Sequence, residues 1–230
     1  MGWWIAGIVL AILFGLFWYW QLIIAEGVYL GQNIVTLLYD WVAHKYNDIK
    51  EFDSQDEQDY LARPLSNALG VNFNGVVLDV ATGTGRLPLA LHRHPDFQGT
   101  VIGVDHSRRM LAQARQSLPG VPLIIADAVH LPFATNAIEA VTCLEALEFF
   151  SSPERGLQEL TRVLQAGGIL LATNRVGWET RLMPGKTWSA DKLQSILASL
   201  PLTRVMVFPW LDIYHQVWAV KQVVTTTEME

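Results

Sequence analysis

Residues 76–86 constrain the fold of this chain more than any other segment. An apolar run at residues 76–80 leads directly into the sequence ATGTGR at residues 81–86, in which two glycines stand one residue apart. β-favouring residues before such a turn, and a helix-like apolar pattern after it, predict a strand, a tight turn and the start of a helix. Glycine suits this turn because the backbone often needs a positive φ there and because a side chain would hold a ligand away. The segment therefore predicts an α/β unit that binds a nucleotide-like ligand.

Position 88 bears on which ligand this turn would bind. A dinucleotide-binding turn has a third small residue three positions after the second glycine, where helix and strand pack closely. Pro88 occupies that position. Proline is tolerated in the first turn of a helix, but it does not provide the close packing. The residue therefore weakens the dinucleotide interpretation.

Each of three successive apolar runs contains an acidic residue or ends at one. Asp79 lies in the first run, Asp105 ends the run 101–105, and Asp127 ends the run 122–127. Any one of them alone could be a turn-forming or helix-capping residue. Together, around one Gly-x-Gly turn, they indicate the carboxyl ends of neighbouring strands, where α/β sheets bind their ligands. The acid about 20 residues after the glycines is placed to accept both ribose hydroxyls, a feature shared with NAD enzymes.

Four segments in this order resemble a known family. Residues 79–85 resemble motif I of the class I S-adenosylmethionine (SAM)-dependent methyltransferases, in the variant of the type 11, quinone-biosynthesis C-methyltransferase-like members. Residues 101–105, 122–128 and 162–171 resemble the later motifs, and the resemblance extends over residues 39–221. It implies a Rossmann-like, doubly wound α/β sheet of seven strands, mostly parallel with a C-terminal antiparallel strand. It also implies SAM as the cofactor, bound by Asp79, Ala81, Thr82, Gly83, Gly85, Asp105, His106, Met110, Asp127 and Ala128.

The N-terminal segment, residues 3–25, contains no charged side chain, and Gln21 is its one strongly polar group outside the aromatic residues. About 20 apolar residues span a hydrocarbon core of roughly 30 Å, and tryptophans stand near both ends, as at membrane interfaces. The sequence therefore predicts one transmembrane helix. We expect a membrane anchor at residues 1–25, an interfacial or lid region at 26–70 and a SAM-binding methyltransferase domain at 71–230. The need for SAM, a cytoplasmic metabolite, favours a cytoplasmic domain.

Residues 27–43 are apolar but too short to cross a membrane easily, which predicts an interfacial or domain-capping helix. Residues 39–47 resemble the segment that precedes motif I in many of these methyltransferases, which implies a lid role for Tyr46. The alternative is an aromatic residue packed beneath the lid. The acidic run 53–59 is expected to be a solvated helix start or loop.

Composition and single residues exclude other classes of site. The formal net charge is -6, and no run of Lys or Arg stands out, so a nucleic-acid partner is not expected. The single cysteine, Cys143, lies in a predicted strand at residues 138–144 and is expected to be a core residue. His92 and His94 would face different sides of a helix, so no metal site is expected.

The second half of the chain continues the strand and helix alternation. Ser107 and Ser152 are expected to cap helices, and Gly167 is expected to follow the end of the second helix. Residues 188–200 predict a further helix. Residues 203–208 and 213–220 predict two strands, and their short connection makes them antiparallel.

SAM is an activated methyl donor, so the protein has to align an acceptor and exclude water. Glu145, Glu148 and His130 are candidate general bases, and none of them is assigned this role. Several aromatic residues could line an apolar pocket or belong to the core; these are Phe149, Phe150, Trp178, Trp188, Trp210 and Tyr214. With the anchor, they favour a hydrophobic, membrane-resident small-molecule acceptor such as a quinone precursor or a lipid.

Two alternatives of other classes remain open. One is an NAD(P)-dependent oxidoreductase, although its Tyr-x-x-x-Lys pair occurs only as Tyr46 and Lys50, before the glycine turn rather than far after it. The other is a non-catalytic, membrane-tethered SAM-binding subunit that scaffolds a partner.

Overall fold

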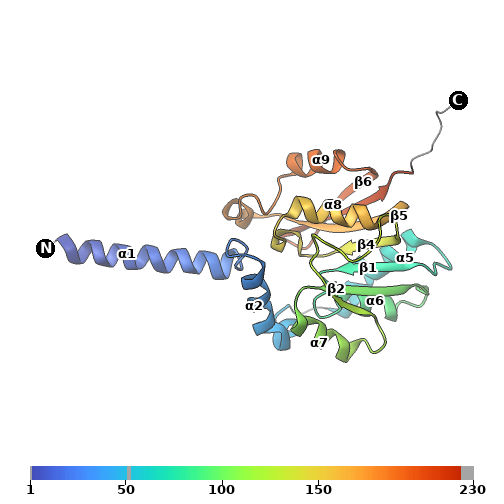
Figure 1. Ribbon diagram of the computed structural model, residues 1–230, viewed down its shortest axis with the longest axis horizontal. Coiled ribbons are helices and arrows are strands. Elements are labelled where there is room, and N and C mark those ends of the chain that lie inside the picture. Colours follow the sequence, from blue (N-terminus) through green and yellow to red (C-terminus); the bar gives the residue numbers. More distant parts are fainter. Residues whose placement is uncertain (1, 51–52, 224–230) are drawn as a thin grey trace.

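The structure, a computed structural model, describes residues 2–50 and 53–223, and within them a seven-stranded sheet forms the centre of the fold (Figure 1). The strand order is β3-β2-β1-β4-β5-β7-β6. Pairing is parallel from β3 to β5, whereas β7 runs antiparallel to both β5 and β6. This confirms the predicted Rossmann-like sheet with a reversed C-terminal strand. The strands are β1 Val76–Val80, β2 Thr100–Asp105, β3 Leu123–Ile125, β4 Ile138–Cys143, β5 Leu164–Arg175, β6 Leu202–Trp210 and β7 Tyr214–Lys221.

Helices precede the sheet and cover its two faces. The α-helices are α1 Gly2–Tyr19, α2 Gln32–Val42, α3 Tyr46–Lys50, α4 Ser54–Glu57, α5 Arg63–Leu69, α6 Arg86–Arg93, α7 Arg108–Ser117, α8 Pro153–Val163 and α9 Ala190–Ala198. The other helical segments of the described residues are short and have 3-10 or π-helical geometry. They are η1 Trp20–Ile24, η2 Ala43–Lys45, η3 Gln58–Ala62, η4 Leu147–Phe149 and η5 Trp178–Leu182.

The core lies on both faces of the sheet because successive strand residues point to opposite sides. Leu78 and Val80 of β1 belong to a buried cluster that includes residues of α8 and α9. Val77, which precedes Leu78, belongs to a different cluster with residues of α5 and α6. The strands are therefore apolar on both sides, as expected of a mostly parallel sheet covered by helices.

The N-termini of two helices are capped as predicted. The Ser107 hydroxyl accepts the backbone N–H of Met110 at 3.0 Å, and the Ser152 hydroxyl accepts that of Arg155 at 3.3 Å. Gly167, however, does not terminate α8. That helix ends at Val163, β5 begins at the next residue, and Gly167 lies inside β5 with φ +78°.

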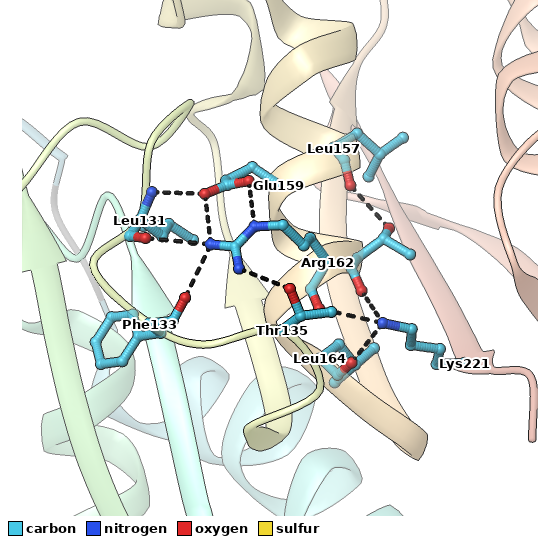
Figure 2. Close-up of polar contacts among 9 residues, drawn as sticks. Leu131, Phe133, Thr135, Leu157, Glu159, Arg162, Leu164 and Lys221 are labelled. Carbon is cyan, nitrogen blue, oxygen red and sulfur yellow. Dashed lines mark hydrogen bonds and ion pairs between the residues drawn. The ribbon is translucent and has the colours of Figure 1, made fainter.

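A buried lysine accounts for the abrupt change from α8 to β5. The Lys221 ammonium donates to the carbonyls of Thr161, Arg162 and Leu164 at 2.5, 3.2 and 2.7 Å (Figure 2). These carbonyls lie at a helix C-terminus, where no intrahelical partner is available and a cation is favourable. The helix therefore ends without a capping glycine. Gly167 instead falls where the register between β4 and β5 shifts, between Leu164 and Ile169.

Arg162 holds the long connection between β3 and β4 against α8 (Figure 2). Its guanidinium donates to the carbonyls of Leu131 and Phe133 at 3.2 and 2.9 Å, and it pairs with Glu159 at 2.7 Å. Glu159 in turn accepts the backbone N–H of Leu131 at 2.8 Å. The loop that follows Asp127 is thereby fixed on the helix beside it.

The N-terminal helix projects away from the domain (Figure 1). The span Trp3–Ile24 is long and apolar enough to cross a membrane, and only 6% of it is buried. Its inner end contacts the domain, because the indole N–H of Trp20 donates to the carbonyl of Leu182 at 3.0 Å. Ala25 and Val28, just beyond the span, are buried in a cluster with Phe149 and Met183.

Candidate active site

A cleft opens at the carboxyl ends of the parallel strands. It holds about 710 Å³ of space, part of it open to solvent, within the usual range of small-molecule sites. Its floor comes from the residues that follow β1, β2, β3 and β4, and α2 covers it with Gln32, Val35, Thr36 and Tyr39. Six of the ten predicted site residues line it: Ala81, Gly83, Asp105, His106, Met110 and Ala128.

The two glycines of the turn have different surroundings. Gly83 has φ +56°, and a Cβ added there would meet no atom within 4 Å, so its backbone faces open space. Gly85 has φ +85° at the N-cap of α6, and an added Cβ would lie 2.3 Å from Leu118 Cδ1. Gly83 thus leaves room in the cleft, whereas Gly85 lets α6 and α7 approach each other.

Two backbone groups hold the carboxylate of Asp105 in the cleft. Its two carboxylate oxygens accept the backbone N–H groups of Gly83 and Ser107, each at 2.8 Å. Burial raises the pKa of this carboxyl, and the two backbone hydrogen bonds oppose that rise. The Ser107 hydroxyl also donates to Asp40 of α2, so the covering helix is fastened beside this carboxylate.

The other predicted residues lie beneath or beside the cleft. Asp79 is buried and accepts the hydroxyls of Thr82 and Thr142 at 2.6 and 2.7 Å, and burial raises its pKa to about 6. Asp127 accepts the N–H of Val129 at 3.0 Å, next to cleft-lining Ala128. For all ten predicted residues, those that line the cleft and those that do not, a direct role in cofactor binding stays a prediction.

A buried ion-pair group that sequence reasoning missed supports one wall. Arg86 donates to Glu57 at 2.5 Å, pairs with cleft-lining Glu145, and lies over the Trp210 ring at 5.1 Å. The acidic run does begin a helix, because Asp53 caps α4. The expectation that it is solvated is wrong for Glu57, because that carboxylate is buried by its pairing with Arg86.

Of the three candidate general bases, Glu145 lines the cleft. Glu148 is buried in the core and accepts the Tyr214 hydroxyl at 2.6 Å. His130 is exposed, with Nδ1 4.0 Å from a carboxylate oxygen of Asp127. Within the described residues, no three His, Cys, Asp or Glu side chains are grouped to hold a metal ion.

The aromatic candidates divide between three environments. Phe149 and Phe150 line the cleft, whereas Trp188, Trp210 and Tyr214 are core residues and Trp178 is exposed.

Tyr39 and Tyr46 add two rings to the cleft. Tyr39 donates to Glu26 at 2.9 Å, and Glu26 pairs with Arg175 at 3.3 Å. One wall of the cleft is therefore hydrogen-bonded to the turn that follows the N-terminal helix.

This sheet order, with a cleft at the carboxyl ends and a reversed last hairpin, is that of the class I methyltransferase fold. A putative SAM-dependent methyltransferase from Methanococcus maripaludis superposes with a TM-score of 0.64 at 14% identity, over 81% of this chain and 95% of the other. The [4+2]-cyclase SpnF superposes equally well, with a TM-score of 0.64 at 21% identity, over 84% of this chain and 97% of the other. At such identities the likeness concerns the fold alone.

Sequence comparison adds evidence about the family to this likeness of fold. Residues 78–172 match a family model described as a methyltransferase domain. The chain is 31% identical over 137 residues to a demethylmenaquinone methyltransferase from Paenarthrobacter aurescens, a match that covers 60% of this chain and 53% of the relative. The family match, this relative and the fold together support a class I SAM-dependent methyltransferase. The chain spans about half the length of the curated relatives that it matches.

Proposed function

We propose that this protein transfers a methyl group from SAM to a small, hydrophobic, membrane-resident acceptor of the quinone-precursor or lipid kind. The observation that carries the proposal is the composition of the cleft. Its lining includes the open backbone of Gly83 and the carboxylate of Asp105, and it also includes the apolar side chains of Val35, Phe149 and Phe150. A cleft with both polar and apolar lining suits a nucleoside-containing donor and an apolar acceptor.

The residues present fit the cofactor. Each oxygen of a carboxylate can accept more than one hydrogen bond, so Asp105 can accept ribose hydroxyls while it keeps the N–H groups of Gly83 and Ser107. The space beside Gly83 admits a ligand against the backbone. His106, Met110 and Ala128 add contact surface to the lining of the cleft. When bound, SAM supplies an electrophilic methyl group.

On the acceptor side, the chain's own contribution is to orient the acceptor and exclude water. Helix α2 covers the cleft with Val35 and Tyr39, and its attachment to Ser107 through Asp40 keeps that cover in place. Excluding water brings donor and acceptor together without competing hydration. A relative named demethylmenaquinone methyltransferase supports a quinone-like acceptor, and Trp3–Ile24, if it spans the bilayer with the domain on the cytoplasmic side, supports one drawn from the membrane.

Transfer of a labelled methyl group tests the proposal. The full-length protein is incubated with methyl-labelled SAM and vesicles made from a quinone-containing lipid extract, and label in the organic phase is measured. We expect incorporation by the parent protein and a loss of at least tenfold for Asp105→Ala, which removes a ligand of the cofactor worth about 1.4 kcal/mol or more. Asp96→Ala, an exposed acid outside the cleft, serves as the matched control and should transfer normally.

Equal incorporation by the parent and by Asp105→Ala would contradict the proposal. Binding of SAM without transfer to any extract would instead favour the non-catalytic subunit. Binding of NADH in place of SAM would favour the oxidoreductase.

A further inference from the structure

Helix α2 has a second apolar face that the cleft does not use. Val35 and Tyr39 point inward and line the cleft. Leu37 and Trp41 stand one helical turn apart on another face, and they are 62% and 74% exposed. A helix that covers a soluble domain is normally polar on its outer face. The outer face of α2 therefore requires a partner.

A second exposed apolar pair comes from a distant part of the chain. Trp178 and Leu182, at the two ends of η5, follow the carboxyl end of β5, and Trp178 is 65% exposed. The segment is held at the base of α1, because Trp20 donates to the Leu182 carbonyl at 3.0 Å and Tyr29 donates to the Pro184 carbonyl at 2.9 Å. Residues more than 150 positions apart are thus joined where the N-terminal helix meets the domain.

Both pairs lie at the end of the domain from which α1 projects. In Figure 1, α2 runs across the direction of α1 at its inner end, and the segment that contains η5 lies at the same end. A membrane normal along α1 would therefore place α2 in the plane of the bilayer surface, with η5 at a similar depth. The opposite end of the domain carries α5 and the turn that precedes β1.

We propose that Leu37, Trp41, Trp178 and Leu182 form a membrane-contact surface that sits in the interface of the bilayer spanned by α1. Tryptophan is favoured at this depth, and helices with one apolar face lie in the interface plane. Two exposed cations are close to this surface in the sequence, Lys45 four residues after Trp41 and Arg181 next to Leu182, and there they would meet anionic headgroups. The inference rests on the proposed membrane anchor, and it goes beyond it by fixing how the domain is oriented.

This orientation would bring the cleft next to the membrane. With the membrane-contact surface in the bilayer, lipid lies against the outer face of α2 and the cleft lies against its inner face. An apolar acceptor would then have to pass only around α2 to reach Val35 and Phe149, without crossing bulk water.

Spin labels measure this orientation directly in the full-length protein. Single substitutions Trp41→Cys and Trp178→Cys are labelled with a nitroxide in vesicles of phosphatidylcholine and phosphatidylglycerol. Leu13→Cys reports on the middle of α1, and Val71→Cys, 89% exposed at the opposite end of the domain, is the matched control. The native Cys143 is buried, and burial raises the pKa of its thiol, so it should remain unlabelled. Collision rates with oxygen, which concentrates in hydrocarbon, and with a water-soluble nickel chelate give the depth of each label.

We expect the label at position 13 to be reached mainly by oxygen. The labels at 41 and 178 should collide with nickel several-fold less than the label at 71. If 41 and 178 are as open to nickel as 71 while 13 lies in hydrocarbon, the membrane-contact surface is refuted and the anchor stands. If 13 is also open to nickel, the anchor and the inference that rests on it both fail.

Discussion

Gly83 and Gly85 are two residues apart, yet replacement should affect different properties. Alanine at either position has to adopt a positive φ, which costs roughly 1–2 kcal/mol. At Gly85, the added methyl group also collides with the buried Leu118 side chain. We therefore expect Gly85→Ala to lower the unfolding temperature more than Gly83→Ala, and Gly83→Ala to weaken SAM binding beyond its effect on stability. Thermal unfolding and titration calorimetry measure the two effects, and equal loss of stability in both variants would contradict the assignment.

Asp79 gives the protein a specific pH dependence. Its pKa is raised by burial from 3.8 to about 6, so the folded state binds this proton more tightly than the unfolded state. The folded state is therefore favoured below about pH 4, and that contribution, on the order of 2–3 kcal/mol, is lost as the pH rises through 6. We expect the stability difference between the parent and Asp79→Asn to change in this direction between pH 4 and 7. A difference that stays constant across this range would show that Asp79 is not titrating.

Most of the helices and strands could be predicted because their signals are local. The serine caps of α7 and α8 and the apolar runs of β1 to β4 each lie within a few residues. The misjudged elements depend on partners far along the chain. Glu57 is buried by Arg86, 29 residues away, and α8 ends where Lys221 caps it, 57 residues beyond Leu164. A charge run or a glycine cannot reveal such partners from the sequence alone.

The role of Lys221 at the C-terminal end of α8 can be tested by substitution. Lys221→Met removes the ammonium and leaves buried carbonyl groups unsatisfied, which should cost about 2–3 kcal/mol. Lys192→Met removes an exposed lysine that pairs with Glu154 at 3.4 Å, and exposed pairs contribute little. We expect chemical denaturation to separate the two variants clearly. Similar small losses in both would mean that Lys221 does not hold the helix end.

Considered as a whole, the molecule brings together three segments that are separate in the sequence, and they meet at the inner end of α1. The apolar N-terminal span, the helix α2 and the segment after β5 join at the base of α1 through Trp20, Tyr29 and Glu26. The sequence predicts the span and the covering helix, and it also indicates the glycine turn and Asp105. It cannot predict that the segment after β5 is attached to the inner end of the span, because those hydrogen bonds join residues 155 and 162 positions apart.

Calorimetric titration of SAM into the purified full-length protein measures whether the cleft binds this cofactor through Asp105. We predict saturable binding that the demethylated product of SAM displaces, that Asp105→Ala weakens at least tenfold, about 1.4 kcal/mol, and that Asp96→Ala leaves unchanged. The absence of SAM binding, or equal affinity in the parent and in Asp105→Ala, would contradict a SAM site at Asp105.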